Sequence, residues 1–460
     1  MPDRPNILFI FDDQHRHDYL GAAGASWLNT PNLDRLAARG TRFTQATTNC
    51  PACGPSRMAL ATGLQPVRAG VLNNGFGRAP HGLPTIYQRM RDYGYHVAST
   101  GKLHLGPTGP PGPNGDPPGA YALGFTHPCE VEGKMSARHV SGPTGPYTHY
   151  LAEKGLLDGF LKDYAKRIEN EWARSNWDSV LPAEDFQDAF IGQKAIDWMR
   201  DTPASQPWMM FVNFVGPHSP FDPPKVYADK YRNAMVPDVV PTRMEGKPDW
   251  IRERDHGLDP DAVTEAQRQY CGAIEAIDAQ VGGMLDLLEE RGMLDDTYVI
   301  FSSDHGEMLG DFGMYAKFVA YEGSVRVPLI AAGPGIPGGE VSDALVELID
   351  VNPTIAELAG LDRQPHIDAQ SFAPVLREGA SAHRIETVSV IENWRSLRTH
   401  DYKLIQNYNE MFELYDLRED PNELRNLADE RPGIRDELFG RLCERFHGSG
   451  KLSRGMRIRI

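Results

Sequence analysis

Residues 50–63 read Cys-Pro-Ala-Cys-Gly-Pro-Ser-Arg-Met-Ala-Leu-Ala-Thr-Gly and form the densest group of chemically useful side chains in the sequence. Because a first helical turn tolerates proline, Pro55 favours a helix that continues over residues 56–64 and places Cys53 at its N-terminus. Free backbone N–H groups and the positive end of the helix dipole favour an anion or a developing negative charge there. Arg57, four residues after Cys53, returns to the same helix face.

Two other interpretations of the cysteines stay open at this point. Cys50 and Cys53 have the C-x-x-C spacing of a thiol redox pair. They can equally be buried thiols, because a free cysteine packs as a small hydrophobic side chain. The odd number of cysteines disfavours a disulfide framework (Cys50, Cys53, Cys129, Cys271 and Cys443).

Two adjacent carboxylates follow the first apolar run of the chain. The run from Asn6 to Phe11, between Pro5 and the pair Asp12-Asp13, is typical of a fully buried parallel strand. In open α/β sheets, ligands bind at the carboxyl ends of the strands, so the position of the two acids suggests a site. The alternative is an ordinary cap or turn, for which aspartate is a common residue.

Strand-like and helix-like segments alternate over more than three hundred residues. Helices are predicted at 30–40, 83–93, 186–200 and 262–291, and strands at 6–11, 95–100, 208–215 and 298–303. This alternation implies an α/β fold with a mostly parallel sheet covered on both faces.

The pattern changes after about residue 375. Short strands are predicted at 387–391, 402–406 and 412–417, followed by a helix at 433–446. We therefore divide the chain into an α/β/α domain over residues 1–375 and a smaller C-terminal α+β subdomain over residues 376–460. The subdomain is expected to hold a small antiparallel sheet and a helix.

Composition narrows the function classes. The chain has 460 residues, of which 40% are hydrophobic and 24% charged, as in ordinary globular proteins. No apolar run approaches the ~20 residues of a membrane-spanning helix. A net charge of −16 disfavours nucleic acid and anionic membrane surfaces as partners. The N-terminal residues lack the pattern of a signal peptide, so we expect a cytoplasmic protein.

The sequence Cys53-Gly54-Pro55-Ser56-Arg57, followed by Thr62-Gly63, resembles the first signature of the type I sulfatases, a formylglycine-dependent family of the alkaline phosphatase superfamily. It departs from that signature at Ala61, where the family has leucine. Further motifs follow in the family's order: Asp12-Asp13 after a buried strand, Gly94-Tyr95 with Gly101-Lys102-Leu103-His104, Pro217-His218, Ser303-Asp304-His305-Gly306-Glu307 with Lys317, and Tyr402-Lys403 with Tyr415-Asp416. The second motif is imperfect, with Val97 where serine or threonine is usual. The resemblance runs from about residue 5 to about residue 428.

The resemblance implies a three-layer α/β/α alkaline-phosphatase-like domain and a sulfatase activity that cleaves sulfate monoesters. Cys53 would be converted to formylglycine by a formylglycine-generating enzyme, and the hydrated aldehyde would be the nucleophile. The residues implied to hold a divalent metal are Asp12, Asp13, Cys53, Asp304 and His305. Carboxylate oxygens suit hard cations, so Ca²⁺ is the first choice, with Mn²⁺ or Mg²⁺ as alternatives.

The residues implied to act on the ester are Cys53, Arg57, Lys102, His104, His218 and Lys317. A sulfate ester is a poor electrophile, because negative oxygens shield its sulfur, and the site must neutralise them. By the resemblance, Lys102 and Lys317 would contact the sulfate oxygens, and Arg57 would steady the aldehyde hydrate. His218 would assist departure of the alcohol, while His104 would take a proton from the second hydroxyl of the sulfated intermediate.

Several questions stay open at the level of sequence. A phosphonate monoester or phosphodiester hydrolase of the same superfamily is the nearest alternative activity, and a metal-dependent binding protein or thiol redox protein is the alternative of another class. The alcohol half of the substrate is not identified, since the loops expected to select it, within residues 106–163 and 226–261, name no ligand. Contact of His15-Arg16-His17 with substrate and assembly into a homo-oligomer are also left open.

Overall fold

The computed structural model describes residues 4–75, 84–106, 111–137, 142–170 and 175–446. Within these residues, eight strands form the main sheet in the order β4-β3-β5-β1-β6-β7-β2-β8. Their bounds are β1 Asn6–Asp13, β2 Gly40–Thr47, β3 His96–Gly101, β4 His127–Glu130, β5 Trp208–Pro217, β6 Thr297–Ser303, β7 Leu329–Ala332 and β8 Glu340–Glu347. Only β7 runs antiparallel to its neighbours, so the sheet is mostly parallel, as predicted.

The central strand β1 belongs to both hydrophobic cores. Ile7, Phe9 and Phe11 pack into one core, and Leu8 and Ile10 pack into the core on the other face. All five side chains are fully buried. This is the alternation of a strand that is covered on both sides, and it explains why the run is apolar without a period of two.

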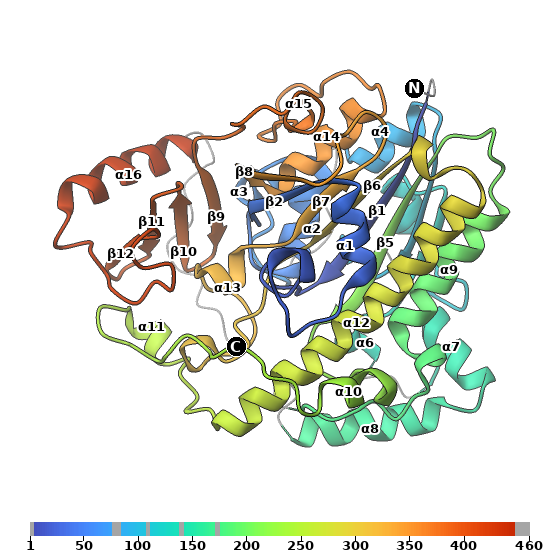
Figure 1. Ribbon diagram of the computed structural model, residues 1–460, viewed down its shortest axis with the longest axis horizontal. Coiled ribbons are helices and arrows are strands. Elements are labelled where there is room, and N and C mark those ends of the chain that lie inside the picture. The colour runs from blue at the N-terminus through green and yellow to red at the C-terminus, as the bar shows by residue number, and fades with distance from the viewer. Residues whose placement is uncertain (1–3, 76–83, 107–110, 138–141, 171–174, 447–460) are drawn as a thin grey trace.

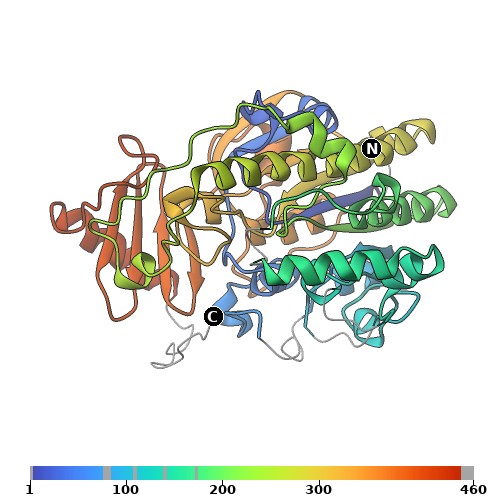
Figure 2. The same cartoon turned by 90° about the horizontal axis from the view of Figure 1, so that it is seen from below.

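Helices cover both faces of the sheet and give three layers (Figures 1 and 2). One face carries α1 Pro31–Ala38, α9 Gln187–Asp201 and α12 Pro260–Glu290, and the other carries α2 Cys53–Thr62, α4 Ile86–Asp92 and α14 Val351–Leu358. Further helices lie between these elements: α3 Pro66–Ala69, α5 Pro118–Ala122, α6 Lys134–Ala137, α7 Pro146–Glu153, α8 Leu157–Glu169, α10 Lys225–Tyr231, α11 Asp249–Arg252, α13 Glu322–Val325 and α15 Ala373–Glu378. Turns of 3₁₀ helix lie at Gly21–Ala23, Ala183–Asp185, Leu294–Asp296, Asp311–Gly313 and Leu348–Asp350. No helix of the described residues is both long enough and apolar enough to cross a membrane.

A second, four-stranded antiparallel sheet lies beside the main body (Figure 1). Its strands are β9 Thr387–Ile391, β10 Trp394–Arg398, β11 Tyr402–Asn407 and β12 Phe412–Asp416, and α16 Pro432–Arg445 packs on it. The predicted C-terminal sheet and helix are therefore confirmed. The division of the chain at residue 375 stays a prediction.

Several elements were not predicted from sequence. These are β2, β4, β7, β8 and β10, each of which is short or lies near the edge of its sheet. The expectation of loops over residues 106–163 was wrong in its described part, which contains four helices and β4. Segment 226–261 likewise contains most of α10, α11 and the first residues of α12.

Candidate active site

The carboxyl ends of β1 and β6 bring the acidic motifs together. These strands pair in parallel with Asp12 opposite Ser303, so Asp13 and Asp304 follow at the same edge of the sheet. The N–H of Gln14 donates to Asp304 Oδ1 at 3.0 Å, which joins the two strand ends. Asp12, Asp13, Asp304 and the adjacent His305 are fully buried.

Four side chains form a cluster that could hold a metal ion. Ligand atoms of Asp13, Cys53, Asp304 and His305 all lie within 4.8 Å of one another. Cys53 Sγ lies 3.2 Å from His305 Nε2 and 3.6 Å from Asp13 Oδ1. Cys53 is the first residue of α2, so a helix N-terminus faces this cluster, as the sequence predicts.

Two further observations fit a divalent cation. His305 Nδ1 lies 2.9 Å from the carbonyl oxygen of Gly306, which only accepts, so Nδ1 carries the proton and Nε2 presents its lone pair to the cluster. Burial lowers the pKa of His305, but Asp304 and Cys53 outweigh it and raise the pKa above its usual value. The position of Nε2 therefore favours positive charge.

Asp12 lies next to this cluster rather than within it. Its Oδ1 is buried and has no hydrogen-bond partner among the described residues. Its Oδ2 lies 2.7 Å from His15 Nδ1, and His15 Nε2 lies 2.7 Å from the carbonyl oxygen of Tyr19. Since that carbonyl only accepts, His15 Nε2 carries a proton and a second proton lies between His15 and Asp12. Burial raises the pKa of Asp12 to about 6.

Arg57 and Lys102 place positive charge beside the acidic residues of the cluster. The guanidinium of Arg57 donates from Nε to Asp304 Oδ2 at 2.9 Å and from Nη1 to the Lys102 carbonyl oxygen at 2.7 Å. Nη1 also donates at 3.0 Å to Oδ1 of Asn213, a residue inside β5. Lys102 Nζ donates to Asp13 Oδ2. Asn213 was not predicted, because an asparagine inside an apolar strand carries no motif of its own.

Lys317 and His218 face each other across the site. Lys317 Nζ lies 2.8 Å from His218 Nε2 and also donates to Gln14 Oε1. His218 Nδ1 lies 2.6 Å from the Ser219 carbonyl oxygen, so Nδ1 carries the proton and Nε2 accepts from Lys317. Burial and then Lys317 lower the pKa of His218.

The electrostatics around Cys53 favour negative charge. Burial raises the pKa of the thiol, but Lys102, Lys317 and His305 together bring the pKa well below its usual value. A hydrogen bond with His104 acts in the same direction. His104 itself follows β3 with a φ of 49°, in the left-handed region. The site therefore combines acids that attract a cation with lysines that attract an anion.

The other candidates from the sequence have different surroundings. Cys50 is a buried free thiol that packs in an apolar cluster with Met308 and Trp394. Arg16 pairs with Asp18 and Asp311, and His15 is fully buried. Contact of His15, Arg16 or His17 with substrate stays a prediction.

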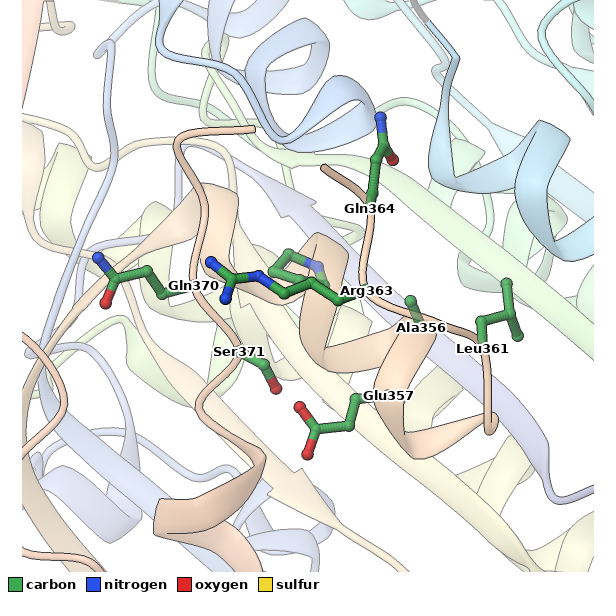
Figure 3. Close-up of a pocket in the computed structure, with 8 residues that line it drawn as sticks. Ala356, Glu357, Leu361, Arg363, Gln364, Gln370 and Ser371 are labelled. Carbon is green, nitrogen blue, oxygen red and sulfur yellow. The ribbon is translucent and has the colours of Figure 1, made fainter. Parts of the chain in front are cut away.

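A cavity of about 380 Å³ lies elsewhere, beside α14 and the segment that follows it (Figure 3). It is lined by Pro353, Ala356, Glu357, Leu361, Arg363, Gln364, Gln370 and Ser371. None of these is a residue of the cluster, and much of the segment after α14 is exposed or half-buried. The chemistry-bearing groups therefore do not lie in this cavity.

Comparison with known proteins agrees with this geometry. A family model described as "Sulfatase" matches residues 5–361, and one described as "N-sulphoglucosamine sulphohydrolase, C-terminal" matches residues 310–445. An arylsulfatase of Clostridium perfringens is 30% identical over 92% of this chain and 90% of its own length. A choline-sulfatase of Rhizobium meliloti is 29% identical over 94% of this chain and 84% of its own length.

The fold is also that of a solved phosphonate monoester hydrolase of Agrobacterium radiobacter. The TM-score is 0.80 at 24% identity, over 97% of this chain and 96% of the other. This likeness shows an alkaline-phosphatase-like α/β fold. The chain belongs to the sulfatase family and is a hydrolase acting on sulfate esters.

Proposed function

We propose that the protein hydrolyses sulfate monoesters through a formylglycine made from Cys53, with a divalent cation beside it. The observation that supports this most strongly is the placement of Cys53. Its Sγ lies at a helix N-terminus, within reach of two carboxylates and one imidazole, in surroundings that lower its pKa. An oxygen at that place, from an aldehyde hydrate, would meet the same groups.

The metal would be held by Asp12, Asp13, Asp304 and His305, together with the modified Cys53. The four-residue cluster and the unpartnered Oδ1 of Asp12 supply hard oxygens and one nitrogen, which fit Ca²⁺ and also admit Mn²⁺ or Mg²⁺. When bound, such an ion polarises sulfate oxygens and stabilises negative charge on the nucleophile. Ca²⁺ remains our first choice.

The side chains of the chain itself have separable tasks. Lys102 and Lys317 would bind sulfate oxygens from two sides, because each ammonium lies close enough to Cys53 to lower the pKa of its thiol. Arg57 would hold the metal ligand Asp304 and keep the end of β3 in place through the Lys102 carbonyl.

Two histidines would move protons. His218 would assist departure of the alcohol through Nε2, the ring nitrogen that accepts a hydrogen bond from Lys317 in this structure. His104 would remove a proton from the remaining hydroxyl at position 53, so that sulfate leaves and the aldehyde returns. Acid and base assistance of this kind contributes about 10²- to 10⁴-fold each.

Intact-mass measurement with activity tests this proposal. Conversion of the Cys53 thiol to the aldehyde lowers the mass by roughly 18 Da, whereas a disulfide between Cys50 and Cys53 lowers it by only roughly 2 Da. We expect the aldehyde in protein co-produced with a formylglycine-generating enzyme, and turnover of aryl sulfates only by that material. An unmodified Cys53 in mature protein from its own host would refute the mechanism. The cytoplasmic location stays a prediction that cell fractionation can check.

A phosphonate monoester hydrolase is the second candidate. The pair Asp304-His305 favours it, since related enzymes that act on phosphorus carry the same pair, and His305 lies within the cluster. The second acid, Asp13, and the Pro-Ser-Arg sequence favour sulfate. Catalytic efficiency on an aryl sulfate and on phenyl phosphonate separates the two, and a preference of more than about 100-fold for the phosphonate would reverse our choice.

A further inference from the structure

Lys317 depends on side-chain anchors, because its backbone belongs to no helix or strand. Its neighbours Ala316 and Phe318 have φ values of 67° and 77°, in the left-handed region that disfavours residues with a Cβ. Lys317 is nevertheless 4% exposed, with its ammonium inside the site. The contacts of Nζ therefore decide where this charge lies.

One of those contacts is the amide of Gln14. This residue is fully buried and directly follows Asp13, with its own φ at 76°. Its Oε1 accepts a hydrogen bond from Lys317 Nζ, and its Nε2 donates to Glu307 Oε2. An ammonium only donates and a carboxylate only accepts, so the amide of Gln14 has one orientation that satisfies both.

Glu307 fixes that orientation and also the backbone beside Lys317. Its Oε2 accepts from Gln14, while Oε1 accepts from the N–H of Leu309 at 3.0 Å and from the N–H of Ala316. All three partners are donors, so a carboxylate suits this place. An amide at position 307 would turn one N–H toward another donor or leave Gln14 without its acceptor.

We propose that Gln14 and Glu307 are positioning residues of the reaction: Glu307 orients the amide of Gln14, and that amide holds the Lys317 ammonium against His218. Neither residue needs to touch substrate. Without the amide, the flexible Lys317 side chain loses a fixed acceptor, and both its contact with sulfate and its hydrogen bond to His218 become less well aligned. This inference rests on the proposed sulfatase activity.

The test compares four variants with the wild type after the aldehyde at position 53 has been verified by mass. Gln14→Leu removes the amide at similar volume, and Glu307→Gln removes the acceptor for it. The double variant Gln14→Glu with Glu307→Gln restores every hydrogen bond, with donor and acceptor exchanged only in the bond between positions 14 and 307. Gln267→Leu is the matched control, because Gln267 is also buried and its Nε2 donates only to the Pro237 carbonyl oxygen, at 3.1 Å.

The decisive readout is the dependence of kcat on the leaving group. We expect each single variant to lose about 10-fold on nitrophenyl sulfate and about 100-fold on phenyl sulfate, because the poorer leaving group needs more help from the proton donor. Binding of inorganic sulfate, measured by calorimetry, should weaken about 10-fold. The double variant should recover at least 10-fold in kcat over Glu307→Gln, while Gln267→Leu should leave the leaving-group ratio unchanged.

Three results would contradict different parts of this reasoning. Folded single variants whose leaving-group ratio and sulfate affinity stay within about twofold of the wild type would overturn the positioning role alone. A double variant no faster than Glu307→Gln would overturn the pairing of the two residues. Wild-type protein that carries the aldehyde but turns over neither aryl sulfate nor phenyl phosphonate would overturn the proposed function, and this inference with it.

Discussion

Replacement of Lys102 by methionine measures how much one buried charge contributes to the free energy of unfolding and to catalysis. The Lys102 side chain is 15% exposed and pairs with Asp13, which is fully buried. Breaking a buried ion pair by removing one partner costs about 3–5 kcal/mol when the other charge is left uncompensated. Arg57 Nη2 lies 3.6 Å from Asp13 Oδ2 and keeps part of that compensation, so we expect a loss at or below the lower end of this range. Lys225 pairs with Asp229 at 2.8 Å, but its side chain is 71% exposed, and loss of such a solvent-screened pair changes the free energy of unfolding little.

The same substitution should also weaken catalysis. A charge-assisted hydrogen bond to a sulfate oxygen contributes about 1.5–3 kcal/mol, which corresponds to about 10- to 150-fold in kcat/KM at 1.4 kcal/mol per factor of ten. We therefore expect Lys102→Met to lower kcat/KM by at least 10-fold and Lys225→Met to leave it unchanged.

The assay needs three measurements on each variant. Intact mass gives the aldehyde content at position 53, urea unfolding gives the free energy of unfolding, and aryl sulfate hydrolysis gives kcat/KM per aldehyde. If Lys102→Met proves no less stable than Lys225→Met, or loses less than threefold in kcat/KM, the reasoning from burial and charge is refuted.

Three further predictions use other parts of the structure. Lys134 Nζ donates to the carbonyl oxygens of His218 and Pro220 and to Asp222 Oδ1, at 2.7–3.1 Å. Lys134→Met should therefore lower kcat about 10-fold or more with the aldehyde content intact. Unchanged kinetics would contradict this. Chelation of divalent metal should abolish aryl sulfate turnover, and Ca²⁺ should restore more activity than Mg²⁺ or Mn²⁺; full activity in chelator would exclude the metal. Burial raises the pKa of Asp188 to about 6, so this carboxyl binds a proton more tightly in the folded state than in the unfolded state. The protonated Asp188 therefore contributes to stability below pH ~4, and this contribution is lost as the pH rises to ~6. Asp188→Asn should be about 1–3 kcal/mol more stable than the wild type at pH 7 and no more stable at pH 4. Urea unfolding at the two pH values checks this.

The sequence sufficed for features that depend on local patterns. The apolar run of β1 with Asp12-Asp13 at its end and the start of α2 at Cys53 are confirmed, because burial of a strand and capping of a helix are encoded by neighbouring residues. Parallel strands place their carboxyl ends at one edge, which accounts for the meeting of Asp13 with Asp304.

The features that the sequence did not predict depend on contacts between residues that lie far apart in the sequence. Gln14 and Asn213 owe their roles to partners that fold onto them from segments about 150–300 residues away. Glu307 stood inside a recognised motif, yet its three donors are visible only in the folded chain. Asp12 was expected among the metal ligands on equal terms with Asp13, and that assignment stays a prediction, since His15 occupies one of its two oxygens.

Because β1 packs into both cores, the proposed site at its end lies on a strand that opens only on global unfolding. A strand whose alternate side chains belong to opposite layers cannot separate from one layer alone, so its amides open only when the whole sheet comes apart. Hydrogen exchange at Ile7 to Phe11 should therefore report global unfolding. The geometry of the proposed site at Asp12 and Asp13 then endures as long as the fold itself.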